Sequence, residues 1–339
     1  MRGLIWVKIF VSIALVILTI HSVYAQKKPI PNSTMNFELD FVRWVSEFPV
    51  KKSDKKKKGI AKGFNEFIFG KKTEILDTPI AVVADNSDEY WILDQKNGVL
   101  ISVDKEEGEF VKIKPREDQH MGSLVGVCKI ADWGFVFTES RNNQVYVLKE
   151  GSKKLVSLGD SIEWQQPTGI AYNKLTDDIW VLETKSHQVT IIGKDGIVKK
   201  VFGSRGIKEG EFNYPTHIWI DNQGTAYIVD AMNFRVQMFN SAGDFVSMFG
   251  KAGDGTGYFA RPKGVATDSH GNIYVVDALF HNVQIFDKTG QLLYFFGTQG
   301  REQGQFWMPN GIYIDEHDNI FVADSYNSRV QIFKLINRK

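Results

Sequence analysis

Hydrophobic and polar residues alternate in short runs along most of the chain, with no long stretch of helical period. Runs of β-branched and aromatic residues are separated by Gly, Asn and Asp turns, as in "GTAYIVDAMNFRVQMF". This pattern is typical of short antiparallel strands. Three copies of it begin at Gly210, Gly257 and Gly304, each 47 residues after the last. A period of this length indicates a repeat architecture built from small sheets.

Two independent markers extend the repeat towards the N-terminus. The first is a start signal of Pro, any residue and Gly, found in full or degenerate form at Pro79, Leu124, Pro167, Pro215, Pro262 and Pro309. The second is an acid that ends the next apolar run, at Asp94, Glu139, Glu183, Asp230, Asp277 and Asp324. Both markers occur six times, so the sequence predicts six repeats.

A third run, such as "RVQMF", and a fourth, such as "DFVSMFG" from Asp244, complete each unit. Six units of four antiparallel strands predict an all-β fold, a six-bladed β-propeller. We expect blades near residues 75–118, 119–162, 163–209, 210–256, 257–303 and 304–339. The sixth unit lacks its fourth run, and "DFVRWVS" from Asp40 resembles that run. Residues 39–48 are therefore predicted to supply the outer strand of the sixth blade and close the ring.

The repeat resembles that of the NHL family of propellers, which carries the same Pro-x-Gly start, the Asp and an Asn-x-Arg-Val turn. The resemblance covers about residues 75–339 and is clearest in the fourth and sixth repeats. The fifth repeat departs from it, with Phe280 and Asn282 in place of Asn and Arg. The chain is also similar to a group of exported bacterial six-bladed propellers with no assigned activity. The resemblance implies a fold and leaves the activity open, because propellers have many functions.

The N-terminus has the layout of an export signal. Arg2 and Lys8 precede an apolar run over residues 9–20, and a cut is expected after Ala25. Residues 1–25 are thus predicted to be a signal peptide and residues 26–38 a linker, and the apolar run is too short for a membrane anchor. Residues 39–74 are predicted to hold the closing strand and an inserted amphipathic helix at 59–69. The protein is expected in the periplasm or outside the cell.

Charge and cysteine content limit the classes of partner. The chain carries 41 basic and 40 acidic residues, which argues against a nucleic-acid partner. Cys128 is the only cysteine, so no disulfide can form within the chain, and its apolar surroundings predict a buried thiol. We expect a monomer with a protein, peptide or glycan partner in the cell envelope.

The alternation of strand direction places three kinds of loop on one face, here called the loop face: the starts of the inner strands, the turns after the acids, and the connections between blades. Function is expected there, around the central channel. The six acids are interpreted as acceptors for backbone N–H groups of the turns, joined by Arg235 and Arg329 in the fourth and sixth blades. Phe212, Phe259, Phe306 and Trp164 are interpreted as wedges between blades.

Residues that break the repeat carry the functional hypotheses. His217 replaces the Gly of the start signal, and His187 and His281 follow acids on the adjacent blades. A zinc site would need all three imidazoles to converge, and solvated or capping histidines are the other interpretation. We therefore expect no cofactor, and a bound zinc or calcium ion is the alternative.

Peptidyl-hydroxyglycine amidating lyase, another six-bladed propeller with similar repeats, implies a zinc held by His at the middle position of Pro-x-Gly. That position is Ile80, Val125, Thr168, Thr216, Lys263 or Asn310 in this chain. None of these is His, so the lyase activity is not carried over. No Gly-x-Ser-x-Gly nucleophile motif occurs either.

Aromatic and basic residues at the irregular positions of the loop face predict a binding surface, because such residues are enriched at interaction hot spots. The predicted ligand-binding residues are Tyr214, His217, Phe234, Arg261, Phe280, His281, Trp307 and Tyr326. The sequence thus favours an exported binding scaffold without catalytic residues. The alternative is a metal-dependent lyase or hydrolase with its site around His217.

Overall fold

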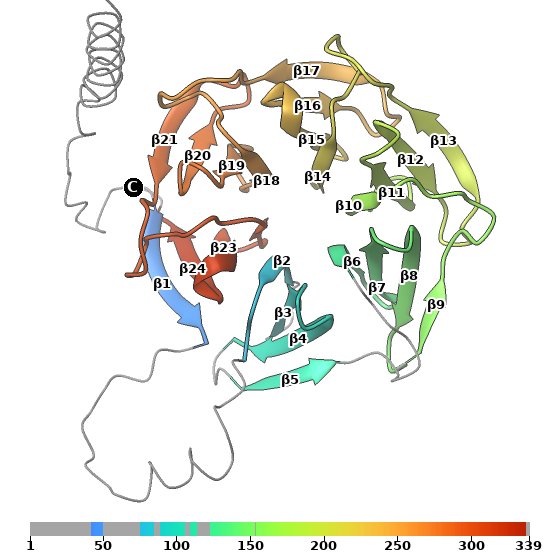
Figure 1. Ribbon diagram of the computed structural model, residues 1–339, viewed down its shortest axis with the longest axis horizontal. Helices are drawn as coiled ribbons and strands as arrows, with labels where there is room; N and C mark the ends of the chain where they lie inside the picture. Colours follow the sequence, from blue (N-terminus) through green and yellow to red (C-terminus); the bar gives the residue numbers. More distant parts are fainter. Residues whose placement is uncertain are drawn as a thin grey trace, which may run out of the picture. The chain divides into compact units, whose positions relative to one another are not determined.

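The structure, a computed structural model, describes residues 42–49, 75–84, 89–105, 109–113, 123–152 and 154–336. These residues form six four-stranded antiparallel sheets arranged as a ring (Figure 1). The prediction of an all-β, six-bladed propeller is confirmed. The predicted signal peptide, linker and helix at 59–69 lie outside the described residues. Within those residues, no helix is long and apolar enough to cross a membrane.

Each blade runs from an inner strand at the channel to an outer strand at the rim. The first three blades are β2 (Pro79–Ala84), β3 (Glu89–Asp94), β4 (Val99–Asp104) and β5 (Phe110–Ile113); β6 (Leu124–Ile130), β7 (Gly134–Glu139), β8 (Gln144–Lys149) and β9 (Leu155–Ser157); and β10 (Pro167–Asn173), β11 (Asp178–Glu183), β12 (Gln188–Ile192) and β13 (Val198–Phe202).

The last three blades follow the same order. They are β14 (Pro215–Ile220), β15 (Ala226–Asp230), β16 (Arg235–Phe239) and β17 (Phe245–Phe249); β18 (Pro262–Thr267), β19 (Ile273–Asp277), β20 (Asn282–Phe286) and β21 (Leu292–Phe296); and β22 (Ile312–Ile314), β23 (Asn319–Asp324), β24 (Arg329–Leu335) and β1 (Val42–Phe48). Strand β22 is shorter than the other inner strands, although Asn310 and Gly311 still exchange backbone hydrogen bonds with Ala323.

The N-terminal strand closes the ring, as the sequence predicts. Strand β1 pairs antiparallel with β24, from Val42 opposite Leu335 to Phe48 opposite Val330. The guanidinium of Arg329 donates to Glu47 at 2.6 Å and to Asp324 at 2.8 Å, and all three side chains are buried. The edge that β24 would otherwise expose is thereby paired.

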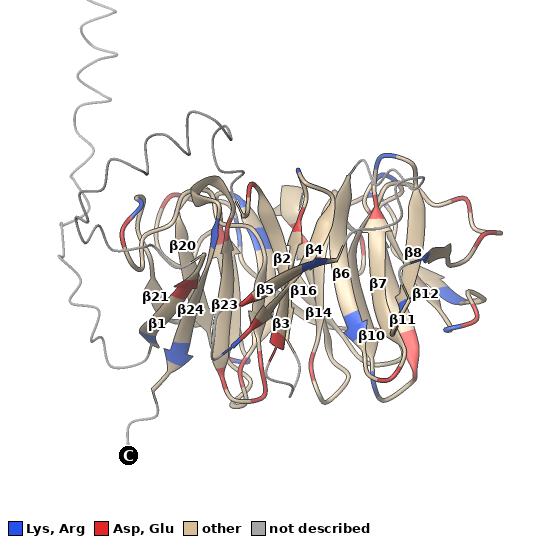
Figure 2. Cartoon of the chain, turned by 90° about the horizontal axis from the view of Figure 1, so that it is seen from below, with Lys and Arg blue, Asp and Glu red and all other residues tan. Residues whose placement is uncertain are grey.

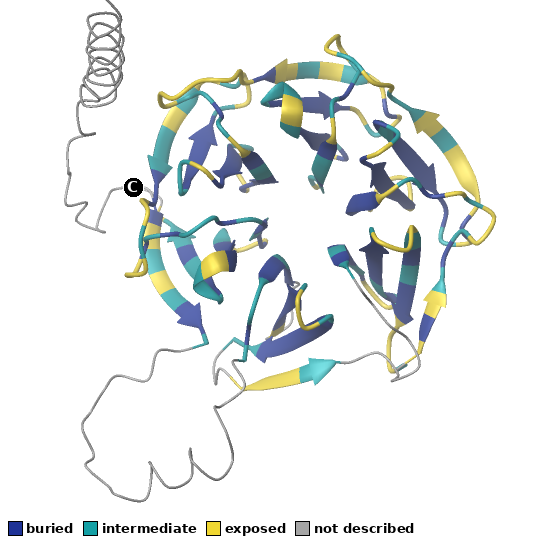
Figure 3. Cartoon of the chain, viewed as in Figure 1, coloured by how far each residue is buried: buried dark blue, intermediate teal, exposed yellow. Residues whose placement is uncertain are grey.

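The predicted wedges fill the junctions between blades. Phe212 is fully buried, with its ring 6.5 Å from Phe202 of the third blade and 5.7 Å from Phe239 of the fourth. Phe259 and Phe306 repeat this arrangement at the next two junctions, and Trp164 lies in the core cluster between the second and third blades. Each junction thus has its own hydrophobic core, and the first three strands of a blade are far more buried than the outer strand (Figure 3).

Gly250 shows why the Phe259 wedge needs a glycine beside it. Gly250 follows the outer strand β17 with a φ of +98°, and a Cβ there would come within 2.4 Å of the ring of Phe259. Only glycine allows both the backbone conformation and the close approach of the ring.

The acids that end the second strands are structural, as the sequence predicts. Asp230 accepts from the backbone N–H of Asn213 at 2.6 Å and from Arg235 at 2.8 Å. Asp277, which has no arginine partner, instead accepts backbone N–H groups from Ala260 and Leu279. Each acid therefore ties the turn behind it, or the segment before the inner strand of its own blade, to the sheet.

Candidate functional site

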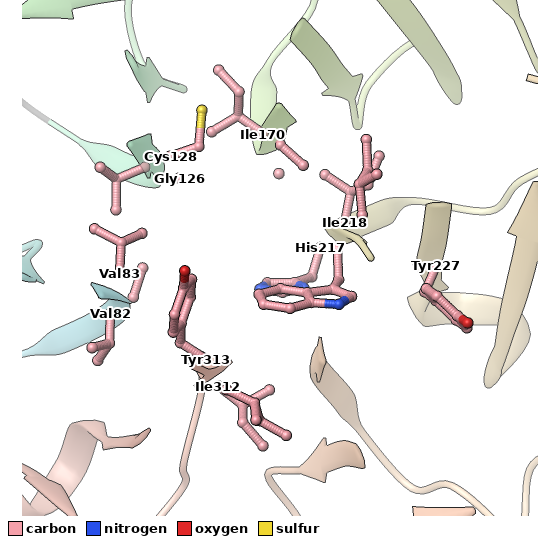
Figure 4. A pocket seen from close by; sticks show the side chains of 18 of the residues that line it. Val82, Val83, Gly126, Cys128, Ile170, His217, Ile218, Tyr227, Ile312 and Tyr313 are labelled. Atoms are coloured by element: carbon pink, nitrogen blue, oxygen red, sulfur yellow. The ribbon is translucent and has the colours of Figure 1, made fainter. Parts of the chain in front are cut away.

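The inner strands surround a central channel with a volume of about 1130 Å³. All six blades contribute to its lining, and Figure 4 shows side chains from different blades around the opening. The channel reaches from the starts of the inner strands on the loop face to the turns after these strands on the opposite face. It is a concave site lined by described residues of every blade, and such sites are where propellers usually hold a ligand.

Three repeat positions of the inner strands set the character of the channel. The second position holds Ile80, Val125, Thr168, Thr216, Lys263 and Asn310 in blade order, and in the first five blades it lies in a β-bulge. The third holds Ala81, Gly126, Gly169, His217, Gly264 and Gly311. The fifth holds Val83, Cys128, Ala171, Trp219, Ala266 and Tyr313. Large or polar side chains are thus concentrated on blades four to six.

Glycine at the third position allows the inner strands to approach one another near the loop face. A Cβ on Gly264 would lie 2.7 Å from the carbonyl oxygen of Asn310 in the next blade. His217 occupies this position in the fourth blade, and its Nδ1 accepts from the backbone N–H of Val265 in the fifth at 3.3 Å. An acceptor role for Nδ1 places the proton of the neutral ring on Nε2. Burial lowers the pKa of His217 to about 4, so the ring is neutral at pH 7.

Two aromatic side chains stand at the fifth position. The rings of Trp219 and Tyr313 meet edge to face with centroids 5.2 Å apart, across the fifth blade, where the same position is Ala266. Trp219 Nε1 donates to Thr267 at 2.9 Å, and the Tyr313 hydroxyl donates to the carbonyl of Ala84 at 2.5 Å. Both rings are half-buried and line the channel, so they offer it a rigid aromatic wall.

Cys128 also lines the channel at this position. The sequence predicts a buried thiol, and the side chain is buried. Burial raises the pKa of Cys128 to about 12, which keeps it protonated and a poor nucleophile at neutral pH.

His187 and His281 lie apart from the channel and link neighbouring blades. His187 Nδ1 accepts from the backbone N–H of Tyr214 at 3.0 Å, and His281 Nδ1 accepts from that of Met308 at 3.1 Å. Asn143 makes the equivalent bond to Gln166 at 2.9 Å. These two histidines therefore cap backbone groups, and only His217 of the three lines the channel. Among the described residues, no three His, Cys, Asp or Glu side chains group closely enough to hold a metal ion.

The other predicted residues lie on the loop face over blades four to six. Tyr326 is exposed, and its ring is 6.4 Å from that of Trp307, which also lies beneath the guanidinium of Arg301 at 4.9 Å. Tyr214 is exposed and packs edge to face on His187 at 4.6 Å. Phe234 and Phe280 are half-buried, and Arg261 is exposed.

A further pattern on the loop face becomes visible when the turns after the acids are aligned. The second residue of each turn is exposed and is, in blade order, Lys96, Arg141, Lys185, Met232, Leu279 and Tyr326. Half of the ring is thus basic and half apolar at one structural position. Both signs of charge occur along the rest of the two faces (Figure 2). Sequence reasoning missed the basic half, although the acid markers give the alignment that reveals it.

Sequence reasoning also missed Trp219 and Tyr313, and treated Lys263 only as the absence of a histidine. The signal was present, because Trp219 and Tyr313 differ from the small residues at the same strand position in the other blades. Whether a strand residue faces the channel depends on the bulge that follows the proline, and the sequence does not show that bulge.

Comparison with known proteins supports the fold. A model of the NHL repeat matches residues 306–333. The comparison with curated proteins finds no match.

Solved structures with similar folds include an auxiliary nutrient binding protein from Bacteroides thetaiotaomicron, with a TM-score of 0.62 and 16% identity, covering 77% of this chain and 70% of that one. A virginiamycin B lyase from Staphylococcus aureus has a TM-score of 0.55 and 15% identity, covering 76% and 95%. A chain of a nidogen–laminin complex gives a TM-score of 0.55 and 16% identity, covering 72% and 84%. At such identities the likeness concerns the fold alone.

Proposed function

We propose that this six-bladed propeller of NHL-type repeats is an exported binding scaffold that holds a polypeptide on its loop face. One observation carries the proposal: three large apolar side chains stand exposed at the same turn position on three consecutive blades. Met232, Leu279 and Tyr326 are 55%, 51% and 66% exposed. Single exposed apolar residues are ordinary on protein surfaces, whereas a grouped and repeated set is typical of an interaction surface.

The charged half of the ring favours a partner that carries carboxylates beside its apolar residues. Arg141 and Lys185 are exposed at the equivalent turns of the second and third blades. Basic side chains at the rim of an apolar surface increase the association rate of an acidic partner. The solved structures with this fold include proteins described as nutrient binding and one member of a complex between proteins. They support a binding role without specifying its ligand.

A displayed peptide library selected on the purified protein tests the proposal. We expect the recovered peptides to combine Asp or Glu with aromatic or branched apolar residues. The triple variant Met232→Ser, Leu279→Ser, Tyr326→Ser should bind them at least about tenfold more weakly, since each side chain is a candidate hot spot.

The matched control carries three serines at the rim. Val201, Val246 and Leu293 are exposed apolar residues on outer strands of blades three to five. Equal loss in the control and the loop-face variant would contradict the proposal. If the selected peptides lacked acidic residues, the basic half of the ring would have no part in binding. If the protein bound only to a glycan array, its ligand would be a sugar and not a polypeptide.

A further inference from the structure

The mouth of the channel on the loop face carries positive charge without a matching carboxylate. Lys263, at the second position of its inner strand, lines the channel and is half-buried. No hydrogen bond or ion pair links its amine to a carboxylate of the described chain. Arg261, two residues earlier, lies close enough that its charge adds to burial in lowering the pKa of Lys263. A half-buried cation without a counter-ion is partly desolvated, so an anion would stabilise it.

The acids of the channel lining lie at the other mouth. Asp221, Asp268, Asp315 and Glu316 belong to the turns that follow the inner strands. Asp268, for example, accepts from the backbone N–H of Asn272 and from the hydroxyl of Tyr274, so it is engaged in its turn. The described lining on the loop-face side contains no Asp or Glu. The opposite mouth also contains Lys174 and Lys288, so its charges are mixed, whereas Lys263 lies on the loop-face side without an acid beside it in the lining.

Hydroxyl groups lie on one side of Lys263 at the same level of the channel, and Asn310 holds the equivalent position on the other side. Thr216 occupies the equivalent position in the neighbouring blade, and its Oγ1 is buried without a hydrogen-bond partner among the described residues. Thr168, one blade further, shares a 2.7 Å hydrogen bond with Thr184. An unpaired buried hydroxyl is rare in proteins, and a ligand oxygen would satisfy it.

The aromatic wall lies deeper in the same channel. Trp219 is three residues beyond Thr216 along its strand, which places it about 10 Å further from the loop face. His217 lies between them, neutral and with its Nδ1 already engaged by Val265. The channel therefore offers a cation and a hydroxyl at one level and flat aromatic surface at the next. Figure 4 shows two of the rings in this lining, those of His217 and Tyr313.

We propose that the channel binds a small anionic ligand, a carboxylate or phosphate attached to a flat apolar body. Lys263 and Thr216 hold the anion at the loop-face mouth, and Trp219 and Tyr313 contact the body. This site is separate from the polypeptide surface at the tips of the turns. The channel volume of about 1130 Å³ is slightly above the range of about 300–1000 Å³ that is common for sites of drug-sized ligands, so a ligand of that size has room in it.

A pair of fluorescent dyes tests the site. The first, 8-anilino-1-naphthalenesulfonate, carries an anionic group on an aromatic body, and N-phenyl-1-naphthylamine has the same body without the charge. We expect the wild-type protein to bind the anionic dye at least about tenfold more tightly than the neutral one, since a charge-assisted hydrogen bond has that strength. Lys263→Met should remove this preference, and the control Lys208→Met, on an exposed loop, should keep it.

Two further variants locate the dyes. Trp219→Ala should weaken both dyes, because both use the aromatic wall. Thr216→Val keeps the shape of the side chain and removes its hydroxyl, so it should weaken binding of the anionic dye alone. This variant still tests the site if another variant fails to fold.

Equal affinity of the two dyes for the wild-type protein would overturn the proposal. So would anionic-dye binding that persists in Lys263→Met and is lost in Leu279→Ser, because the dye would then lie on the polypeptide surface. Since the peptide test uses residues at the turn tips and the dye test uses channel residues, either can fail while the other succeeds.

Discussion

At the scale of single residues, the positions that break the repeat have unequal roles. His187 and His281 look like metal ligands in the sequence, yet each accepts a backbone N–H across a blade junction. His217 accepts one as well, but its ring also lines the channel. The same residue type thus serves as a blade link in two places and as part of the channel wall in a third.

Replacement of His187 should alter the response of stability to pH. Burial, with a further contribution from Arg205, lowers the pKa of His187 below its usual value of about 6.5. A histidine with a depressed folded pKa contributes stability above about pH 6.5, and this contribution is lost as the pH falls. His187→Asn supplies the acceptor that Asn143 supplies elsewhere and does not titrate. We expect a shallower fall in Tm between pH 7 and 5, measured by circular dichroism.

His187→Ala separates the hydrogen bond from the charge. It leaves the N–H of Tyr214 without its acceptor and should lower the free energy of unfolding by about 1 kcal/mol already at pH 8. An unchanged pH response in the Asn variant would mean that His187 does not contribute to it.

At the scale of strands and turns, the blades are joined by a repeated side-chain bond. The first residue after the acid donates to the carbonyl that starts the next inner strand: Gln95 to Leu124, Ser140 to Pro167, Thr184 to Pro215 and Ser325 to Pro79. Ala231 and Ala278 occupy this position in the fourth and fifth blades and have no side-chain donor. These junctions depend more on their phenylalanine wedges.

Loss of one such bond should be measurable. Thr184→Val keeps the shape of the side chain, removes its 2.6 Å bond to Pro215 and leaves Thr168 without its partner. We expect a loss of about 1–2 kcal/mol in the free energy of unfolding, from urea denaturation. Ser247→Ala, on the outer strand β17, is the control and should change it little. A Thr184→Val protein as stable as this control would show that the wedges alone hold the junction.

At the scale of the whole molecule, stability depends on a contact between the two ends of the described chain. Arg329 of β24 is buried between Asp324 of its own blade and Glu47 of β1. Arg235 is the equivalent residue of the fourth blade, and it donates to Asp230 in the same way. Its Nη1 donates to the carbonyl of Ile207, whereas Nη1 of Arg329 donates to Glu47. The sixth blade therefore replaces a local contact with one that closes the ring.

Arg329→Met should destabilise the protein strongly, by about 3–5 kcal/mol, because two buried carboxylates lose their cation. Combined with Glu47→Gln in a double-mutant cycle of urea denaturation, it should show a coupling above about 1 kcal/mol. The exposed pair Lys200–Asp244, which also joins two blades, is the control and should show a smaller coupling. Additive effects of Arg329→Met and Glu47→Gln would contradict a role for this pair in closure.

The sequence alone predicted much of the fold and little of the site. The Pro-x-Gly starts, the acids and the Phe wedges recur at nearly constant spacing and act within a blade or between adjacent blades, so a linear pattern reveals them. Arg261, Trp307 and Tyr326 lie on the loop face because strand alternation sets the face, and their role in binding stays a prediction. Lys263, Trp219 and Tyr313 could not be ranked, since a bulge after the proline decides which side chains enter the channel.

The sequence by itself determined the number of blades, their strand order and the origin of the closing strand, because each rests on a repeated local pattern and on pairing rules that hold in every blade. Only the tertiary structure decided which side chains share a space. Lys263 and Thr216 line one channel, and Trp219 contacts Tyr313 across an intervening blade, only after all six inner strands form the ring. The physical reason is distance along the chain: a repeat specifies its neighbours, whereas the channel is formed by all six blades together.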